Sequence, residues 1–157
     1  MATVAARVAL VFAVGVVGGA ELGKVPIALP ALSRDFGLSL VQGGLLLGMF
    51  QIASMAVGVF AGMLADRFGQ RRVMITGLVA SAAGALAQNA TMLLVSRGIE
   101  SIGFMAIVLP GPALLARVVQ PGRLRAVMGL WGCYMPTGMG LVLLFGPLLL
   151  AAADWRA

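Results

Sequence analysis

The sequence predicts an all-α, polytopic membrane protein with five transmembrane helices and a cytoplasmic N-terminus. Of its 157 residues, 61% are hydrophobic and 10% are charged, which is more apolar surface than a water-soluble core of this size can hide. The charges are also widely spaced. Asp35 and Asp66 are separated by 30 uncharged residues, and Arg72 and Arg97 by 24 more. Since about 20 apolar residues of helix cross a bilayer, each of these runs is long enough to span one.

The first predicted helix covers residues 7–30. Its apolar run follows Arg7 and continues, past a short polar interruption, to Pro30. A basic residue, an apolar stretch and small residues near position 20 also resemble a secretory signal peptide. The run continues well beyond that point, however, which favours a span directed outward. We expect residues 31–40 to form a short external loop.

The other four predicted helices follow in alternating directions. The second, 41–65, returns to the cytoplasmic side, where a charged turn from Gly62 to Arg72 joins it to the third, 73–88. The fourth and fifth cover residues 92–116 and 126–152. Three arginines in the charged turn place it in the cytoplasm, because short loops rich in Lys and Arg are retained there.

Composition excludes several classes of protein. The chain has no histidine and a single cysteine, Cys133, so it lacks the usual metal ligands, a disulfide framework and the usual general base. No nucleophile and base set or phosphate-binding loop is present, and we expect neither an enzyme nor a cofactor. The net charge of +6 is distributed over short loops, which indicates membrane orientation and not nucleic-acid binding.

Four charged residues fall inside the predicted spans: Glu21, Lys24, Arg97 and Glu100. Each costs roughly 2.5 to 3.5 kcal/mol on insertion scales unless it has a partner or water. Glu21 is expected about 20 Å from the inner surface and Arg97 about 9 Å from the outer one, so their depths nearly coincide. We therefore expect a polar cluster on the outer half of a solute pathway. Two self-neutralised pairs that only hold the helices together remain the alternative.

Glycine and proline add two expectations about the helices. Gly15, Gly19 and Gly23 recur every four residues, a pattern typical of close helix packing, and Glu21 and Lys24 fall on the opposite face. Prolines inside spans leave carbonyl groups unpaired and bend helices, either as points of flexing or as static kinks. The candidate positions for helix flexing are Pro110, Pro112, Pro136, Gly146 and Pro147.

The charged turn carries a recognisable motif. Its pattern G-x-x-x-D-R-x-G-x-R-R resembles the signature between helices 2 and 3 of the major facilitator superfamily of secondary transporters. The matching residues are Gly62, Asp66, Arg67, Gly69, Arg71 and Arg72. The resemblance implies that Asp66 contacts the opposite half of the transporter and that the arginines help to latch an inner gate.

Two further segments resemble the same family. Arg97 and Glu100 lie in a pattern similar to R-x-x-Q-G-x-G of helix 4, with Glu100 at the Gln position and Ser101 at the first Gly. Gly146 and Pro147 resemble the Gly-Pro pair of helix 5 in proton-coupled exporters, although the flanking glycines differ. In this family the first and fourth helices line the central cavity, which agrees with the expected cluster.

The resemblance implies a fold and a function. Members have two halves of six helices, each half a pair of inverted three-helix repeats, and residues 1–157 resemble the first half without its sixth helix. We expect a partial N-terminal transmembrane half of a transporter in the plasma membrane, which is the inner membrane of a bacterium. Its partners would be lipid, a small solute and the C-terminal half. Transport by alternating access, driven by protons, is one hypothesis; a non-transporting five-helix remnant or interaction partner is the other.

Overall fold

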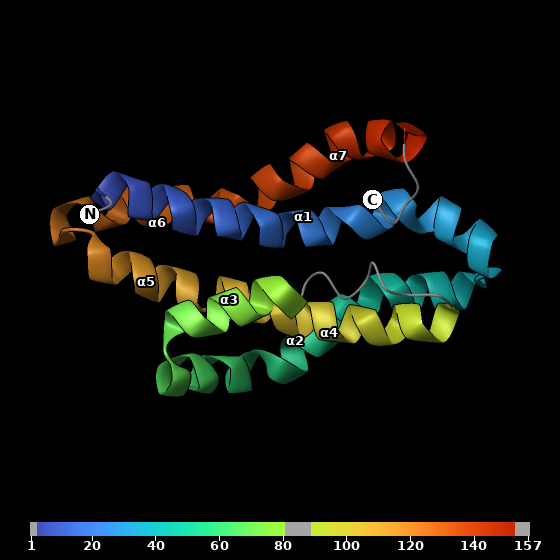
Figure 1. Cartoon of the computed structure of the whole chain (residues 1–157), viewed down its shortest axis with the longest axis horizontal. Helices are drawn as coiled ribbons and strands as arrows, with labels where there is room; N and C mark the ends of the chain where they lie inside the picture. The colour runs from blue at the N-terminus through green and yellow to red at the C-terminus, as the bar shows by residue number, and fades with distance from the viewer. Residues whose placement is uncertain (1–2, 81–88, 153–157) are drawn as a thin grey trace.

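The computed structural model describes residues 3–80 and 89–152, and within them all regular structure is helical (Figure 1). The helices are α1 (Val4–Phe36), α2 (Leu40–Phe68), α3 (Gln70–Ala80), α4 (Ala90–Val108), α5 (Pro110–Val118), α6 (Pro121–Gly132) and α7 (Tyr134–Ala152). The all-α class predicted from the sequence is therefore confirmed. Residues 81–88, in the third predicted helix, lie outside the described part of the chain.

Three described helical segments are long and apolar enough to cross a membrane. They are Val4–Phe36, Thr91–Val118 and Pro121–Ala151, the last two each formed by a pair of consecutive helices. In α2, which is 29 residues long, the apolar segment within the described residues is Leu40–Ala56. This set of helices is that of a multi-pass membrane protein.

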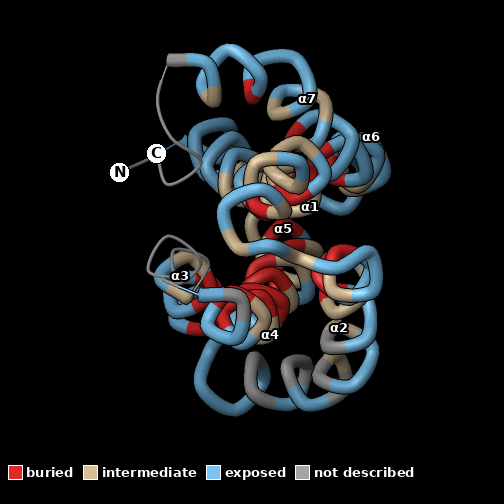
Figure 2. The backbone as a smooth tube through the Cα atoms, turned by 90° about the vertical axis from the view of Figure 1, so that its right-hand side faces the viewer, coloured by how far each residue is buried: buried red, intermediate tan, exposed pale blue. Residues whose placement is uncertain are grey.

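The helices form two groups that pack against each other along their length. In the end-on view, α1, α6 and α7 lie in one group and α2, α3 and α4 in the other, with α5 between them (Figure 2). Within the groups, α1 packs along α7, and α4 packs against both α2 and α3. The contacts of α5 with α1, α3 and α6 connect the groups. A second connection runs directly from α1 to α4 and carries the polar cluster.

The first helix is longer than the sequence predicted. We expected it to end at Pro30 and residues 31–40 to form a loop, but α1 continues to Phe36 and ends at Gly37, whose φ of 61° suits the left-handed region. A proline inside a helix removes one hydrogen bond without ending it when packing compensates. Here Leu32 is buried in a cluster with Val25, Leu46 and Leu93, which stabilises the additional turns.

The charged turn is much shorter than expected. Most of the segment from Gly62 to Arg72 is helical, since α2 extends to Phe68 and α3 begins at Gln70. Only Gly69 separates the two helices, and its φ of 90° is a conformation that side chains other than glycine rarely adopt. The chain therefore reverses at one residue. The predicted start of the third helix at residue 73 was three residues too late.

Prolines explain where the two later predicted helices are interrupted. The predicted helix 92–116 is divided at Leu109, directly before Pro110, and the predicted helix 126–152 is divided at Cys133, three residues before Pro136. Neither proline can donate the backbone hydrogen bond of a continuous helix. Leu109 and Cys133 nevertheless keep right-handed helical backbone angles, so the helix bends and continues. Pro121 also begins α6 five residues before the predicted start.

Glycines allow α1 and α7 to approach closely. A Cβ atom on Gly19 would lie 2.9 Å from the carbonyl oxygens of Tyr134 and Met135, and one on Gly138 only 2.1 Å from the carbonyl oxygen of Val16. A Cβ atom on Gly23 would lie 3.3 Å from the carbonyl oxygen of Met139, also on α7. The glycine face of α1 is thus the packing face that its four-residue spacing predicted.

Candidate functional site

Two charged pairs face each other across the contact between α1 and α4. Glu21 and Lys24 are three residues apart on α1, and Arg97 and Glu100 are three residues apart on α4. This spacing places both members of a pair on one side of their helix. Since the glycine face of α1 is packed on α7, its charged side is free to meet α4, and the structure brings all four side chains together.

The four charges form one continuous chain of ion pairs. Glu21 pairs with Lys24, and Lys24 donates a hydrogen bond from Nζ to Glu100 Oε1 at 2.9 Å. Glu100 accepts from the guanidinium of Arg97 through its other carboxylate oxygen. Lys24 is therefore shared between two carboxylates on different helices. The sequence predicted the two local pairs, and the structure adds the bridge that joins them.

The pair on α4 is more deeply buried than the pair on α1. The Lys24 side chain is 38% exposed and that of Glu21 is 12% exposed, whereas Arg97 is 3% exposed and Glu100 is fully buried. A buried ion is expensive unless it is paired and hydrogen-bonded. The pair on α4 meets this condition, and the most exposed side chain of the cluster is that of Lys24.

Arg97 is held in place by more than its carboxylate partner. Its guanidinium carbon lies 5.0 Å from the ring centroid of Phe50 on α2, a cation–π contact. The hydroxyl of Ser101 donates to the Arg97 carbonyl oxygen at 2.7 Å. Within the described residues, the buried Nε of Arg97 has no hydrogen-bond partner. No signal in the sequence indicated Phe50, because it belongs to a helix whose register against α4 depends on the fold.

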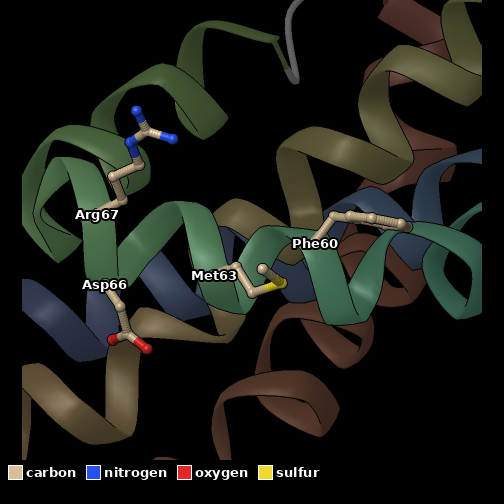
Figure 3. Close-up of a pocket in the computed structure, with 4 residues that line it drawn as sticks. All are labelled: Phe60, Met63, Asp66 and Arg67. Carbon is tan, nitrogen blue, oxygen red and sulfur yellow. The ribbon is translucent and has the colours of Figure 1, made fainter.

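The charged motif lies apart from this cluster, at the junction of α2 and α3. Asp66 and Arg67 are exposed and point to opposite sides of α2, and with Phe60 and Met63 they line an open hollow of about 540 Å³ (Figure 3). The Arg67 guanidinium lies over the ring of Phe68 at 5.7 Å. Arg71 and Arg72 are exposed at the start of α3, Gly62 lies within α2, and Gly69 forms the reversal.

The residues expected to allow helix flexing lie at bends or in tight packing. Pro110 is buried at the first position of α5, Pro112 lies one position beyond Gly111, and Pro136 is exposed in the first turn of α7. Pro147 is exposed inside α7, and Gly146 packs on Ile27 of α1. Trp131 and Tyr134 pack beside these bends with ring centroids 4.6 Å apart.

The described residues contain no group of three or more side chains suited to bind a metal ion. The cluster could exchange one ion-pair partner for another. It combines two carboxylates, the partly exposed Lys24 and a buried guanidinium that is paired with one of the carboxylates. Groups of this kind inside apolar helices mark solute or proton pathways in membrane proteins.

A comparison with protein families gives a match to the Major Facilitator Superfamily over residues 9–157. The chain belongs to the major facilitator superfamily. The match covers nearly the whole chain, including both the charged motif and the cluster, and it agrees with the resemblance seen in the sequence. Members of this superfamily are transmembrane transporters and not enzymes, as predicted.

Several curated transporters are distant relatives. A puromycin resistance protein of Streptomyces alboniger is 30% identical over 140 residues, which cover 84% of this chain and 27% of the relative. A tetracenomycin C resistance and export protein of Streptomyces glaucescens is also 30% identical, over 85% of this chain and 26% of its own length. A cis,cis-muconate transport protein of Acinetobacter baylyi is 28% identical over 89% of this chain and 35% of its own length. The chain thus spans about a quarter to a third of these relatives.

Proposed function

We propose that this superfamily member carries out secondary active transport of a small solute by alternating access, driven by protons. The observation that best supports the proposal is the chain of ion pairs between α1 and α4. Four charges in apolar helices are costly, and a purely structural contact between these helices would be formed more cheaply by apolar side chains. Retaining them is reasonable if one of the carboxylates, Glu21 or Glu100, carries the coupling proton.

The charged motif supports the conformational part of the proposal. We infer that Asp66 and the arginines beside it form one side of a cytoplasmic gate whose other side lies in a second transmembrane half. The side chains that this requires are exposed, and an open hollow lies next to Asp66. An aspartate placed against the N-terminus of another helix gains from the helix dipole, and that contact is lost when the halves separate.

The proposed topology follows from the distribution of arginine. Five spans with the N-terminus in the cytoplasm would place Arg67, Arg71 and Arg72 on the inner side, together with the basic segment between α5 and α6. The basic residues next to the α5–α6 junction are Arg117 in the last turn of α5 and Arg123 and Arg125 at the start of α6. This arrangement satisfies the rule that short cytoplasmic loops are enriched in Lys and Arg. The membrane would be the plasma membrane, which is the inner membrane in a bacterial cell.

The test compares accumulation with exchange in proteoliposomes. Labelled puromycin and cis,cis-muconate serve as probes, because a puromycin resistance protein and a cis,cis-muconate transport protein are among the relatives. The protein should accumulate or expel at least one probe when a proton gradient is imposed. Glu100→Gln keeps the size of the side chain but removes the proton-binding carboxylate. If Glu100 carries the coupling proton, this variant should abolish accumulation driven by the gradient and leave exchange at equilibrium intact; if Glu21 carries it, Glu21→Gln should do so instead.

Arg123→Gln provides the matched control, since it also neutralises one charge but lies in the exposed first turn of α6. It should accumulate the probe as the unaltered protein does. Full accumulation by Glu100→Gln would remove Glu100 from the coupling role. Absence of gradient-dependent movement of either probe by the unaltered protein would instead favour a non-transporting membrane protein or interaction partner.

A further inference from the structure

Lys24 is the most exposed charged side chain of the cluster. It is 38% exposed, against 12% for Glu21, 3% for Arg97 and none for Glu100. A charged side chain on an apolar, membrane-spanning helix requires water or a polar partner. A solute that enters from water would therefore meet Lys24 before the other three side chains.

The contacts of Lys24 also leave it able to bind. An ammonium group has three donors, and the described residues supply two carboxylate contacts, from Glu21 and Glu100. Arg97 is not available in the same way, because it is buried, contacts Glu100 and is covered by Phe50. A solute anion would thus meet Lys24 and not Arg97.

The two carboxylates differ in how readily Lys24 can exchange them. Glu100 contacts two cations, Lys24 and Arg97, whereas the ion pair described for Glu21 is with Lys24 alone. Releasing Glu21 from Lys24 breaks the ion pair of a carboxylate that is 12% exposed, whereas releasing Glu100 breaks the hydrogen bond of a fully buried carboxylate, which is more costly because a buried charge cannot be hydrated. We propose that Lys24 binds the anionic group of a small organic carboxylate, and that Glu21 is the internal anion which this solute displaces.

Charge balance gives the consequence for coupling. The cluster holds two positive and two negative side chains, so binding one solute carboxylate leaves it with a net charge of −1. A proton transferred from hydronium to the released Glu21 breaks one O–H bond of hydronium and forms one O–H bond on the carboxyl group, which leaves a water molecule and restores the cluster to neutrality. A cationic solute, in contrast, would have to separate Lys24 from both carboxylates. The statement that the bound anion is the transported solute rests on the proposed function. The anion-binding site at Lys24 does not depend on that function.

The sequence provides a direct test, because Lys24 is its only lysine. Acetylation of the purified protein in proteoliposomes by sulfo-N-hydroxysuccinimide acetate is followed at Lys24 and at the N-terminal amine, and mass spectrometry measures both. The probes are benzoate, benzyl alcohol and benzyltrimethylammonium, which share a ring and differ in charge. The N-terminal amine is the internal control for reagent activity.

Benzoate at about four times its dissociation constant should slow acetylation of Lys24 about fivefold relative to the N-terminus, since occupancy reduces the free fraction by 1 + [L]/Kd. Benzyl alcohol and benzyltrimethylammonium should leave the ratio unchanged. The proposal is overturned if benzyltrimethylammonium changes the rate, if benzyl alcohol protects as well as benzoate, if benzoate gives no protection, or if Lys24 does not react at all.

Glu21→Gln tests the exchange step. It removes the competing anion and leaves the Lys24 contact with Glu100, so the benzoate concentration for half-protection should fall about threefold or more. An unchanged or higher benzoate requirement contradicts displacement of Glu21. Both measurements are made without a proton gradient. If benzoate protects Lys24 from acetylation but no probe is transported, the proposed function is disproved and the anion site stands. If a cation is transported and benzoate gives no protection, the anion site is disproved and the proposed function stands.

Discussion

Lys24 Nζ and Glu100 Oε1 lie 2.9 Å apart although 76 positions separate these residues in the sequence. This hydrogen bond joins α1 to α4 and unites two local ion pairs into one cluster. It also leaves the buried end of the cluster dependent on Arg97 and Glu100, whose side chains have almost no access to solvent.

Glu100→Leu should destabilise the protein strongly. The substitution leaves the Arg97 guanidinium buried without its counter-ion, and breaking a buried ion pair from one side costs about 3 to 5 kcal/mol. Unfolding in mixed detergent micelles, followed by circular dichroism, measures the loss. The double variant Arg97→Leu with Glu100→Leu removes both charges and should recover at least half of the stability. A double variant as unstable as the single one would show that the unpaired charge is not the cause.

Phe50 and Arg97 should be energetically coupled. A cation–π contact removed from water contributes about 2 kcal/mol, so a double-mutant cycle of Phe50→Leu with Arg97→Met should give a coupling energy of about 1 to 2 kcal/mol. The same cycle made with Phe104→Leu is the control, since Phe104 contacts the Phe50 ring at 4.9 Å but has no described contact with the guanidinium. Equal coupling in both cycles would indicate general packing.

Gly138→Ala should disrupt the packing of α1 on α7. Its Cβ would lie 2.1 Å from the Val16 carbonyl oxygen, and overpacking of this kind costs about 1 to 3 kcal/mol. Gly140→Ala is the matched control on the same helix, because a Cβ at this position would meet no atom within 4 Å. The control should unfold at the same detergent concentration as the unaltered protein or a higher one. Helix propensity favours alanine over glycine in both variants, so similar losses in both would mean that close approach to Val16 is not the cause.

Gly69→Ala should weaken the reversal between α2 and α3. A residue with a Cβ is destabilised by about 1 to 2 kcal/mol in a left-handed backbone conformation, and Gly69 has a φ of 90° with open space around it. Gly98→Ala, at an uncrowded helical position on α4, is the control. Thermal unfolding in detergent compares the two. If Gly69→Ala is as stable as Gly98→Ala, the backbone angle does not limit this site.

The sequence predicted those features that depend on composition and local spacing. Long uncharged runs predicted apolar helices, and the three-residue spacing of Glu21 with Lys24 predicted a local pair. The expected depths of Glu21 and Arg97 also placed the charges of α1 and α4 near each other. The link from Lys24 to Glu100 and the ring of Phe50 could not be specified, because both depend on how the helices are rotated and packed.

Helix boundaries were the least predictable feature, for a physical reason. Pro30 was expected to end α1, but burial of Leu32 keeps the helix going. The whole charged motif was expected to form a turn, but one glycine is sufficient to reverse the chain. A proline or glycine in the sequence indicates that a helix is locally less stable at that position. Whether the helix ends there depends on the tertiary contacts of the residues around it.

The two faces of α1 also fix its rotation and its depth. Gly19 and Gly23 must face the backbone of α7 while Lys24, the next residue after Gly23, must reach α4. An insertion of one residue between Gly19 and Glu21 would turn Gly19 by about 100° relative to Gly23 and the charged residues after the insertion, so that the glycines could no longer all face α7 while Lys24 keeps its bridge to Glu100. This short segment should therefore tolerate many conservative substitutions away from those faces but no change in length.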